Sequence, residues 1–190
     1  AALTGDEHFA FDTYRRFIQM FSKIILDADP RDFEHLLEQY KERAHVATDA
    51  EIPAADLKQL VVEFKQVAER QSGEPFPTDV HQQLQKAIEA VFSSWNNKRA
   101  FDYRNFNKIP HSLGTAVNVQ TMVFGNMGTD SGTGVAFTRN PSTGEKVLYG
   151  EYLLNAQGED VVAGIRTPSK ISRLQDDMPH VYEQFQQIAQ

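Results

Sequence analysis

The chain has 190 residues, of which 41% are hydrophobic and 24% are charged. This composition fits a folded globular protein and argues against a disordered or fibrous one. The formal net charge of −7 argues against sequence-independent nucleic-acid binding, which needs a basic face. The chain has no cysteine, which excludes disulfides and cysteine-ligated metal sites. No apolar run approaches the ~20 residues of a membrane-spanning helix, so we expect neither a nucleic-acid nor a membrane partner.

Glycine is distributed unevenly and divides the chain into two parts. Nine of the 11 glycines lie between Gly114 and Gly164, while the preceding part has a helical pattern. Pro110 and Gly114 interrupt that pattern, as such residues commonly do at the end of a helical region. We therefore predict a helical subdomain over residues 1–107 and a second subdomain over residues 108–190.

The first part predicts four or five amphipathic helices, because its apolar residues recur every three or four positions. Helix starts are expected at Asp29-Pro30, at Pro53 and at Thr78-Asp79, where capping residues or proline precede apolar runs. A further short helix is expected in 96–107. We interpret the apolar stripes as core packing and not as a cofactor pocket. The residues expected to face inward are Ala10, Tyr14, Phe17, Phe21 and Ile24, then Phe33, Leu36, Leu37 and Tyr40, then Leu57, Leu60, Val61, Phe64 and Val67, and finally Leu84, Ile88, Val91, Phe92 and Trp95.

The second part predicts strands, because apolar and polar residues alternate in it. The expected strands are 117–123, 135–138 and 147–154, followed by a helix over 178–189. The fold class is therefore α+β, with an N-terminal helical bundle followed by a small sheet and a C-terminal helix.

Two motifs in the second part could carry chemistry. Residues 131–134 (SGTG) are expected to form a loop between strands, where small residues let backbone N–H groups approach a phosphate. The motif is neither a Walker A loop nor a dinucleotide fingerprint, and from its residues alone a plain hairpin turn is the favoured interpretation. Glu159 and Asp160 follow Gly158 and could hold Mg²⁺, accept ribose hydroxyls or simply face solvent. Glu151 is a further candidate carboxylate, whereas no two histidines have metal-ligand spacing.

Long segments of the chain resemble the pyruvate phosphate dikinase family. They are residues 14–21 (YRRFIQMF), 90–97 (AVFSSWNN), 118–126 (NVQTMVFGN), 131–146 (SGTGVAFTRNPSTGEK) and 150–168 (GEYLLNAQGEDVVAGIRTP). The resemblance covers essentially the whole chain. It implies an internal piece of an ATP-grasp domain, made of a helical subdomain and part of an antiparallel nucleotide-binding sheet. Such enzymes use ATP and Mg²⁺ to phosphorylate a histidine on a mobile carrier domain while interconverting pyruvate and phosphoenolpyruvate.

The resemblance also implies roles for individual residues. A hinge strand that contacts adenine would include Gln120, Thr121, Met122 and Val123. Thr133 and Gly134 would belong to a phosphate loop, and Glu159 and Asp160 would lie near the ribose or the metal. The carrier domain would dock on Arg99, Ser142 and Glu151, with Arg15 joining that surface. No catalytic residue and no metal ligand is assigned within the chain.

Parts of the family pattern lie outside this sequence, namely a phosphate-binding lysine and arginine, an Asp-x-Glu pair and a Gln-x-Arg pair. We therefore expect the chain by itself to be inactive. Two alternatives stay open: the ATP-binding domain of a phosphoenolpyruvate synthase, and a helical module that binds protein and no nucleotide. The family occurs in bacterial cytosol and plant plastids, and we take the cytoplasm as the expected location.

Overall fold

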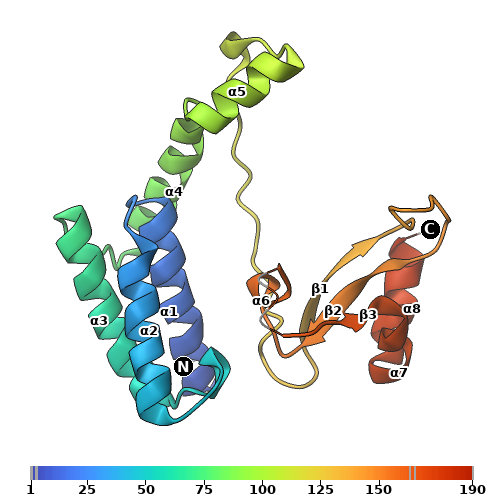
Figure 1. The fold of residues 1–190 in the computed structure, drawn as a ribbon, viewed down its shortest axis with the longest axis horizontal. Helices are drawn as coiled ribbons and strands as arrows, with labels where there is room; N and C mark the ends of the chain where they lie inside the picture. The colour runs from blue at the N-terminus through green and yellow to red at the C-terminus, as the bar shows by residue number, and fades with distance from the viewer. Residues whose placement is uncertain (1, 3, 163, 165, 190) are drawn as a thin grey trace. The chain divides into compact units, whose positions relative to one another are not determined.

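The protein is described by a computed structural model that covers residues 2, 4–162, 164 and 166–189 (Figure 1). Its contacts divide the chain into two compact units, Ala1–Val119 and Gln120–Gln190, and each unit is described by itself. The helical unit thus includes the extended stretch that follows its last helical turn, His111–Leu113. The boundary between residues 107 and 108 stays a prediction.

Among its described residues, the helical unit contains five α-helices, as the apolar periodicity predicts. They are α1 (Glu7–Ile24), α2 (Pro30–Ala44), α3 (Ala54–Ser72), α4 (Val80–Ser94) and α5 (Lys98–Asn107), with short 3-10 turns at Asp49–Glu51 and His111–Leu113. The expected helix starts are confirmed: the side chains of Asp29 and Asp79 accept backbone N–H groups of α2 and α4, and Pro53 precedes α3. Such caps satisfy N–H groups that have no partner within the helix.

Helices α1, α2 and α3 pack around one hydrophobic core. Phe33 and Phe64 are fully buried, and their rings meet edge to face with centroids 5.1 Å apart. Phe21 makes a similar contact with Phe76 at 5.4 Å. Burying one such side chain contributes about 1.5–3 kcal/mol, so this core stabilises the unit. The interpretation of these stripes as core packing is confirmed for the buried set Phe21, Phe33, Leu37, Tyr40, Leu57, Leu60, Val61, Phe64 and Val67.

The apolar stripe of α4 is a different case, because the prediction that it faces inward is wrong. None of its described residues is buried, and Leu84, Val91 and Phe92 are 41–50% exposed. Helices α4 and α5 extend away from the three-helix bundle (Figure 1), so little of the core reaches this face. Ile24, at the end of α1, is also exposed and lines an apolar groove of about 530 Å³ between α1 and α4.

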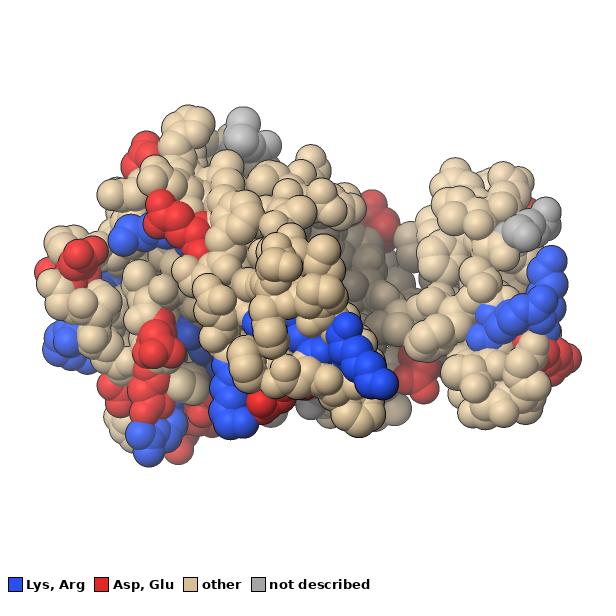
Figure 2. All heavy atoms as spheres, turned by 90° about the horizontal axis from the view of Figure 1, so that it is seen from above, with Lys and Arg blue, Asp and Glu red and all other residues tan. Residues whose placement is uncertain are grey.

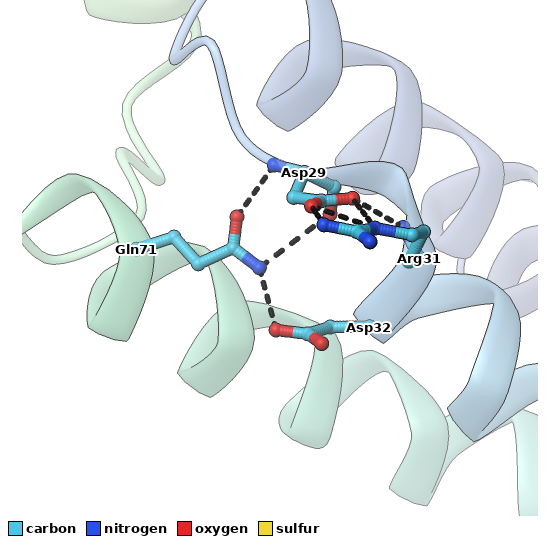
Figure 3. Close-up of polar contacts among 4 residues, drawn as sticks. All are labelled: Asp29, Arg31, Asp32 and Gln71. Atoms are coloured by element: carbon cyan, nitrogen blue, oxygen red, sulfur yellow. Dashed lines mark hydrogen bonds and ion pairs between the residues drawn. The ribbon is translucent and has the colours of Figure 1, made fainter.

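A polar cluster ties the start of α2 to the end of α3 (Figure 3). The Gln71 side chain accepts the backbone N–H of Asp29 at 2.6 Å and donates to the Asp32 carboxylate at 2.7 Å. The Asp29 carboxylate accepts the backbone N–H of Arg31 at 3.0 Å and the Nε of the same residue at 2.9 Å. These charged hydrogen bonds lower the pKa of Asp29 to about 2.

The sheet unit confirms the α+β class and contains a three-stranded antiparallel sheet. Its strands are β1 (Gly132–Phe137), β2 (Tyr149–Leu154) and β3 (Ser169–Lys170), in the order β1-β2-β3. The helices are α6 (Gly158–Val162), α7 (Leu174–Asp177) and α8 (Pro179–Ile188), and α8 confirms the expected C-terminal helix. Strand β3 was not predicted, because two residues are too few to show an alternation.

The prediction of a strand over 117–123 is wrong in this structure. Among the described residues no neighbouring strand pairs with this segment, and the side chains of Val119 and Val123 are 68% and 88% exposed. Alternation shows that a segment suits a sheet, but a strand forms only where its N–H and C=O groups find a partner strand.

The two faces of the sheet differ. One face carries Tyr152 and Leu154, which pack with Ile171, Leu174 and Phe185 from the following helical segments. The opposite face, here called the open face, carries Thr133, Val135, Phe137, Tyr149, Glu151, Leu153 and Lys170, because side chains alternate along each strand and paired residues share a face. Of these residues only Leu153, at the Thr133 end, is buried.

Charged side chains of both signs are interspersed over the part of the surface seen in Figure 2. No helix among the described residues is long and apolar enough to span a membrane.

Candidate functional site

The glycines of the SGTG motif lie within a strand, which corrects the expectation of a loop. A Cβ atom on Gly134 would lie 2.5 Å from the carbonyl oxygen of Glu151, and one on Gly132 would lie 2.8 Å from that of Leu153. Any larger residue would therefore push β1 away from β2. Strand packing alone explains both glycines, so a phosphate-binding role depends on Thr133 and on what surrounds it.

The turn before β1 is locked to the end of β2. The Ser131 hydroxyl donates to the carbonyl of Gly125 at 3.0 Å and accepts the N–H of Met127 at 2.9 Å. The N–H of Asn155 donates to the Ser131 carbonyl, and that of Ala156 to the Gly125 carbonyl, each at 2.8 Å. These bonds hold the first residues of β1 beside the chain that leads into α6.

This arrangement brings together two motifs that are far apart in the sequence. The nearest atom to a Cβ on Gly158 would be the Thr133 hydroxyl oxygen, at 3.9 Å. The adjacent Glu159 is exposed, so its carboxylate lies at the surface of α6. The structure therefore brings the Thr133 hydroxyl close to the start of α6, the helix that carries the two predicted carboxylates.

Asp160 has a different environment from Glu159. It is 8% exposed, and its carboxylate accepts the backbone N–H of Gln157 at 2.8 Å. This bond caps α6 in the manner of an acidic residue at a helix start. The contact gives Asp160 a structural role that the sequence motif alone does not reveal.

Gln157 is a residue that sequence reasoning missed, although it belongs to the same motif. Its side chain is 7% exposed, and its Nε2 has no hydrogen-bond partner among the described residues. A buried donor without a partner costs about 1–3 kcal/mol, which is unusual in a purely structural residue. The polarity of Gln157 directly before Gly158 was the available signal.

A cavity of about 360 Å³ lies beside β1. Three predicted nucleotide-binding residues line it: Val123, Thr133 and Gly134. Its other walls are mainly apolar and include Tyr152 and Phe185. Gln120, Thr121 and Met122 are exposed in the extended segment before it and are not among its lining residues.

The described residues contain no group of three or more His, Asp or Glu side chains arranged to hold a metal. The carboxylates that follow Gly158 are those of Glu159 and Asp160, and the Asp160 carboxylate caps the start of α6. Mg²⁺ usually binds one or two protein carboxylates together with water and substrate phosphates. This donor set therefore fits a metal that arrives with a nucleotide better than one held by the protein alone.

The predicted docking residue Arg15 lies in the interior and not on a surface. It is 2% exposed, bonds the carboxylate of Asp12 and lies 3.6 Å from that of Asp49. Burial raises the pKa of Asp12, but the charges and hydrogen bonds of Arg15 and Arg16 outweigh it and keep that pKa below its usual value. The expectation that Arg15 joins an exposed surface is corrected, because these ion pairs hold its charge inside the helical unit.

The other three predicted docking residues are exposed. Arg99 lies on α5 in the helical unit, whereas Ser142 and Glu151 lie in the sheet unit. Ser142 follows β1 in a turn, where its N–H donates to the Asn140 side chain at 2.9 Å. Glu151 lies on the open face, paired in register with Val135 and Lys170.

Comparison with known proteins agrees with this geometry. Residues 78–188 match the family model described as "Pyruvate phosphate dikinase, AMP/ATP-binding domain". The chain is 56% identical over 190 residues to the pyruvate, phosphate dikinase of Clostridium symbiosum, covering all of this chain and 22% of that protein. It is 56% identical over 185 residues to pyruvate, phosphate dikinase 1, chloroplastic, of Oryza sativa, covering 97% of this chain and 19% of that protein.

The chain thus spans about a fifth of the length of these curated relatives. The family match contains β1, β2, α6 and the cavity residue Val123, so the region that carries the candidate site is also the region that the family shares. The chain belongs to the pyruvate phosphate dikinase AMP/ATP-binding domain family.

Proposed function

We propose that this chain forms part of the ATP-binding domain of a pyruvate phosphate dikinase, which phosphorylates a carrier histidine on another domain. Two observations carry the proposal: the cavity lined by Val123, Thr133 and Gly134, and the closeness of the Thr133 hydroxyl to Gly158, the first residue of α6. Both lie within the segment that matches an AMP/ATP-binding domain. We place the enzyme in the cytoplasm, although the rice relative is named chloroplastic.

The cavity suits the base of a nucleotide. Its volume of about 360 Å³ is near the lower end of the ~300–1,000 Å³ found for small-molecule pockets, and its walls are mainly apolar. The backbone of the 120–123 segment would hydrogen-bond the adenine, and the Thr133 hydroxyl would donate to a phosphate oxygen. Glu159 would accept ribose hydroxyls or contact the metal.

Phosphoryl transfer depends mainly on positioning and on charge neutralisation. Mg²⁺, bound with ATP, would neutralise phosphate charge, and the exposed carboxylate of Glu159, which directly follows Gly158, would face it. Asp160 would act through α6, because its carboxylate holds the start of that helix. The carrier domain would dock on Arg99, Ser142 and Glu151, whose exposure suits reversible, charge-steered contacts.

The test uses the full-length enzyme that contains this chain. We expect Glu159→Ala to slow phosphorylation of the carrier histidine by ATP about 100-fold, an effect of the size seen when one electrostatic contact to the transition state is lost. The phosphoenolpyruvate half-reaction should stay intact, because it occurs at a separate site. Rapid-quench measurement of each half-reaction separates the two effects. Glu183→Ala, an exposed change on α8, is the control.

A second comparison separates nucleotide binding from docking. Asp160→Ala should also impair the ATP half-reaction, with faster amide exchange in α6 because its cap is lost. Reversing the charge of Arg99 or Glu151 should leave ATP affinity intact while transfer to the histidine falls. If Glu159→Ala leaves the kinetics of the ATP half-reaction unchanged, the proposed nucleotide site is wrong. If charge reversal at Glu151 slows both half-reactions equally, the proposed docking role of Glu151 is wrong.

We further propose that the 190-residue chain alone does not transfer phosphate from ATP to pyruvate, because the family's lysine, arginine and acidic pairs lie outside it. Turnover by the purified chain would contradict this.

The names of the relatives favour a dikinase over a phosphoenolpyruvate synthase, and phosphate-dependent formation of pyrophosphate by the full-length enzyme is the distinguishing assay. Titration with Mg·ATP tests the alternative of a helical protein-binding module.

A further inference from the structure

A second cavity lies entirely within the helical unit, where α4 ends and α5 begins. Its volume is about 370 Å³, and it is lined by Ser94, Trp95, Asn97, Arg99, Tyr103 and Arg104, among others. One of these lining residues, Arg99, is a proposed docking residue, whereas the cavity itself has no part in the proposed function. Two of its lining residues are arginines, whose guanidinium groups favour an anionic ligand.

Arg104 is buried at this cavity without a negative charge beside it. It is 3% exposed, and burying a charged group is costly unless it is paired. Its Nε donates to His111 Nδ1 at 2.9 Å, and its Nη1 donates to the Trp95 carbonyl at 2.6 Å. Both acceptors lack a negative charge, and among the described residues no carboxylate forms an ion pair with Arg104.

The guanidinium of Arg104 is also held in place by aromatic rings. Its central carbon lies 3.9 Å from the centre of the Trp95 ring. The His111 ring that accepts its Nε–H is stacked on Phe101, with centroids 4.6 Å apart. The Arg104 fork is therefore fixed before any ligand binds, which reduces the entropy lost on binding.

Arg99 supplies a second cation to the same cavity, and unlike Arg104 it is exposed. Residues 98–108 contain four basic side chains and one carboxylate, that of Asp102. That carboxylate is already paired with Lys98 at 2.5 Å. The cavity thus lies in a basic stretch of a chain whose net charge is −7.

We propose that this cavity binds a phosphate group between Arg99 and Arg104. Two guanidinium groups match the charge and the several acceptor oxygens of a phosphate dianion, and arginine forks bind such oxygens in pairs. The phosphate is either a free ion or a monoester carried on a larger molecule. The inference does not depend on the proposed nucleotide site, which lies in the sheet unit.

The single tryptophan of the chain, Trp95, is a direct reporter, because it lines the cavity and stacks on Arg104. Titrating the 190-residue chain with inorganic phosphate at constant ionic strength should give a saturable change in its fluorescence. Arg99→Gln should weaken that binding about tenfold or more, since a hydrogen bond to a charged group contributes about 1.5–3 kcal/mol.

Lys98→Gln is the matched control. It removes the same charge from the residue before Arg99, and the Lys98 side chain does not line the cavity. It should change the affinity less than about twofold, as expected for an exposed ion pair. Circular dichroism checks that both variants keep their helix content. Arg99 is the variant of choice because Arg104→Gln would also disturb the contacts with Trp95 and His111.

A parallel titration with O-phosphoserine separates the two sources of phosphate. Tighter binding of phosphoserine assigns the cavity to a phosphorylated side chain, and equal binding assigns it to a free ion; both outcomes support the proposal. The proposal is overturned if acetate at the same ionic strength produces the same change as phosphate, if no saturable change occurs, or if Lys98→Gln and Arg99→Gln weaken binding equally.

Discussion

The two units of this protein are built by different interactions. Helices α1, α2 and α3 satisfy their own backbone and meet through large apolar side chains such as Phe33 and Phe64. Strands β1 and β2 satisfy their backbone only through each other, and they approach so closely that Gly134 and Gly150 leave no room for a side chain. Local sequence rules are therefore sufficient for most of the first unit and insufficient for the second.

The units also differ in how their candidate sites form. In the sheet unit, Thr133 lies near Gly158 because the turn at 125–131 is hydrogen-bonded to the residues that follow β2. In the helical unit, Arg99 and Arg104 share a cavity because both lie on α5 and because the chain returns at His111 to contact it. The first site depends on strand pairing, and the second on helix geometry and one returning loop.

The largest effect is expected in the helical core. Phe64→Ala should lower the free energy of unfolding by about 3–5 kcal/mol, because Phe64 is fully buried against Phe33. Urea unfolding followed by circular dichroism measures it. Phe106→Ala is the control. That side chain is 87% exposed, so its removal should change the free energy of unfolding by less than about 0.5 kcal/mol. Equal losses in the two variants would contradict a core built on side-chain packing.

A smaller loss is expected from the sheet. Gly134→Ala should destabilise the β1–β2 pair by about 1–3 kcal/mol, the range for forcing extra atoms into a packed site, since its Cβ would meet the Glu151 carbonyl. Amide hydrogen exchange in β1 and β2 reports it. Gly158→Ala should be tolerated, because its Cβ would meet nothing closer than 3.9 Å. Unchanged exchange in Gly134→Ala would restore a ligand-binding explanation for that glycine.

A still smaller effect is expected where the sheet meets α7. The Tyr152 hydroxyl donates to the Asp177 carboxylate, so Tyr152→Phe should cost about 1 kcal/mol, the typical net contribution of a hydrogen bond. Burial, followed by this bond, raises the pKa of Tyr152 from 10.0 to about 12.

A raised tyrosine pKa means that the contribution of Tyr152 is present below pH 10 and is lost as the pH rises toward 12. The thermal unfolding temperature of the wild type should therefore fall more over that pH range than that of Tyr152→Phe. Tyr149→Phe, at a 45% exposed tyrosine, is the control and should keep the wild-type pH dependence.

The smallest effect concerns the link between α2 and α3. Hydrogen bonds from the Arg31 side chain and backbone hold the pKa of Asp29 at about 2, below its ordinary value of 3.8. Because that pKa is lowered in the folded state, its contribution is present above about pH 4 and is lost as the pH falls toward 2. Asp29→Asn keeps a capping side chain but should flatten the acid dependence of unfolding in that window.

The carboxyl chemical shift of Asp29 measures the same effect directly. Arg31→Gln should move its titration midpoint upward toward the ordinary value, since both the guanidinium and its hydrogen bonds are removed. A midpoint that does not move would show that the cap position, and not Arg31, sets the acidity.

The sequence by itself determined the helices and their starts, because caps and apolar periodicity act within a few residues. Asp29, Pro53 and Asp79 lie at helix starts, as expected, and the apolar residues of α2 and α3 mark the core. The family could also be identified from segments such as 131–146, whose sequence is long and specific. Thr133 and Glu159 were found as candidates in the same way.

Only the tertiary structure decided which surfaces find partners. Residues 117–123 have the alternation of a strand, but no strand in the described part of the chain pairs with them, and none of the described residues of α4 is buried. Arg15 and Arg104 are both buried arginines on helices, yet Arg15 is neutralised by Asp12 and Arg104 is not. Burial, pairing and charge compensation each need a second segment to arrive from elsewhere in the chain, and no local pattern contains that segment.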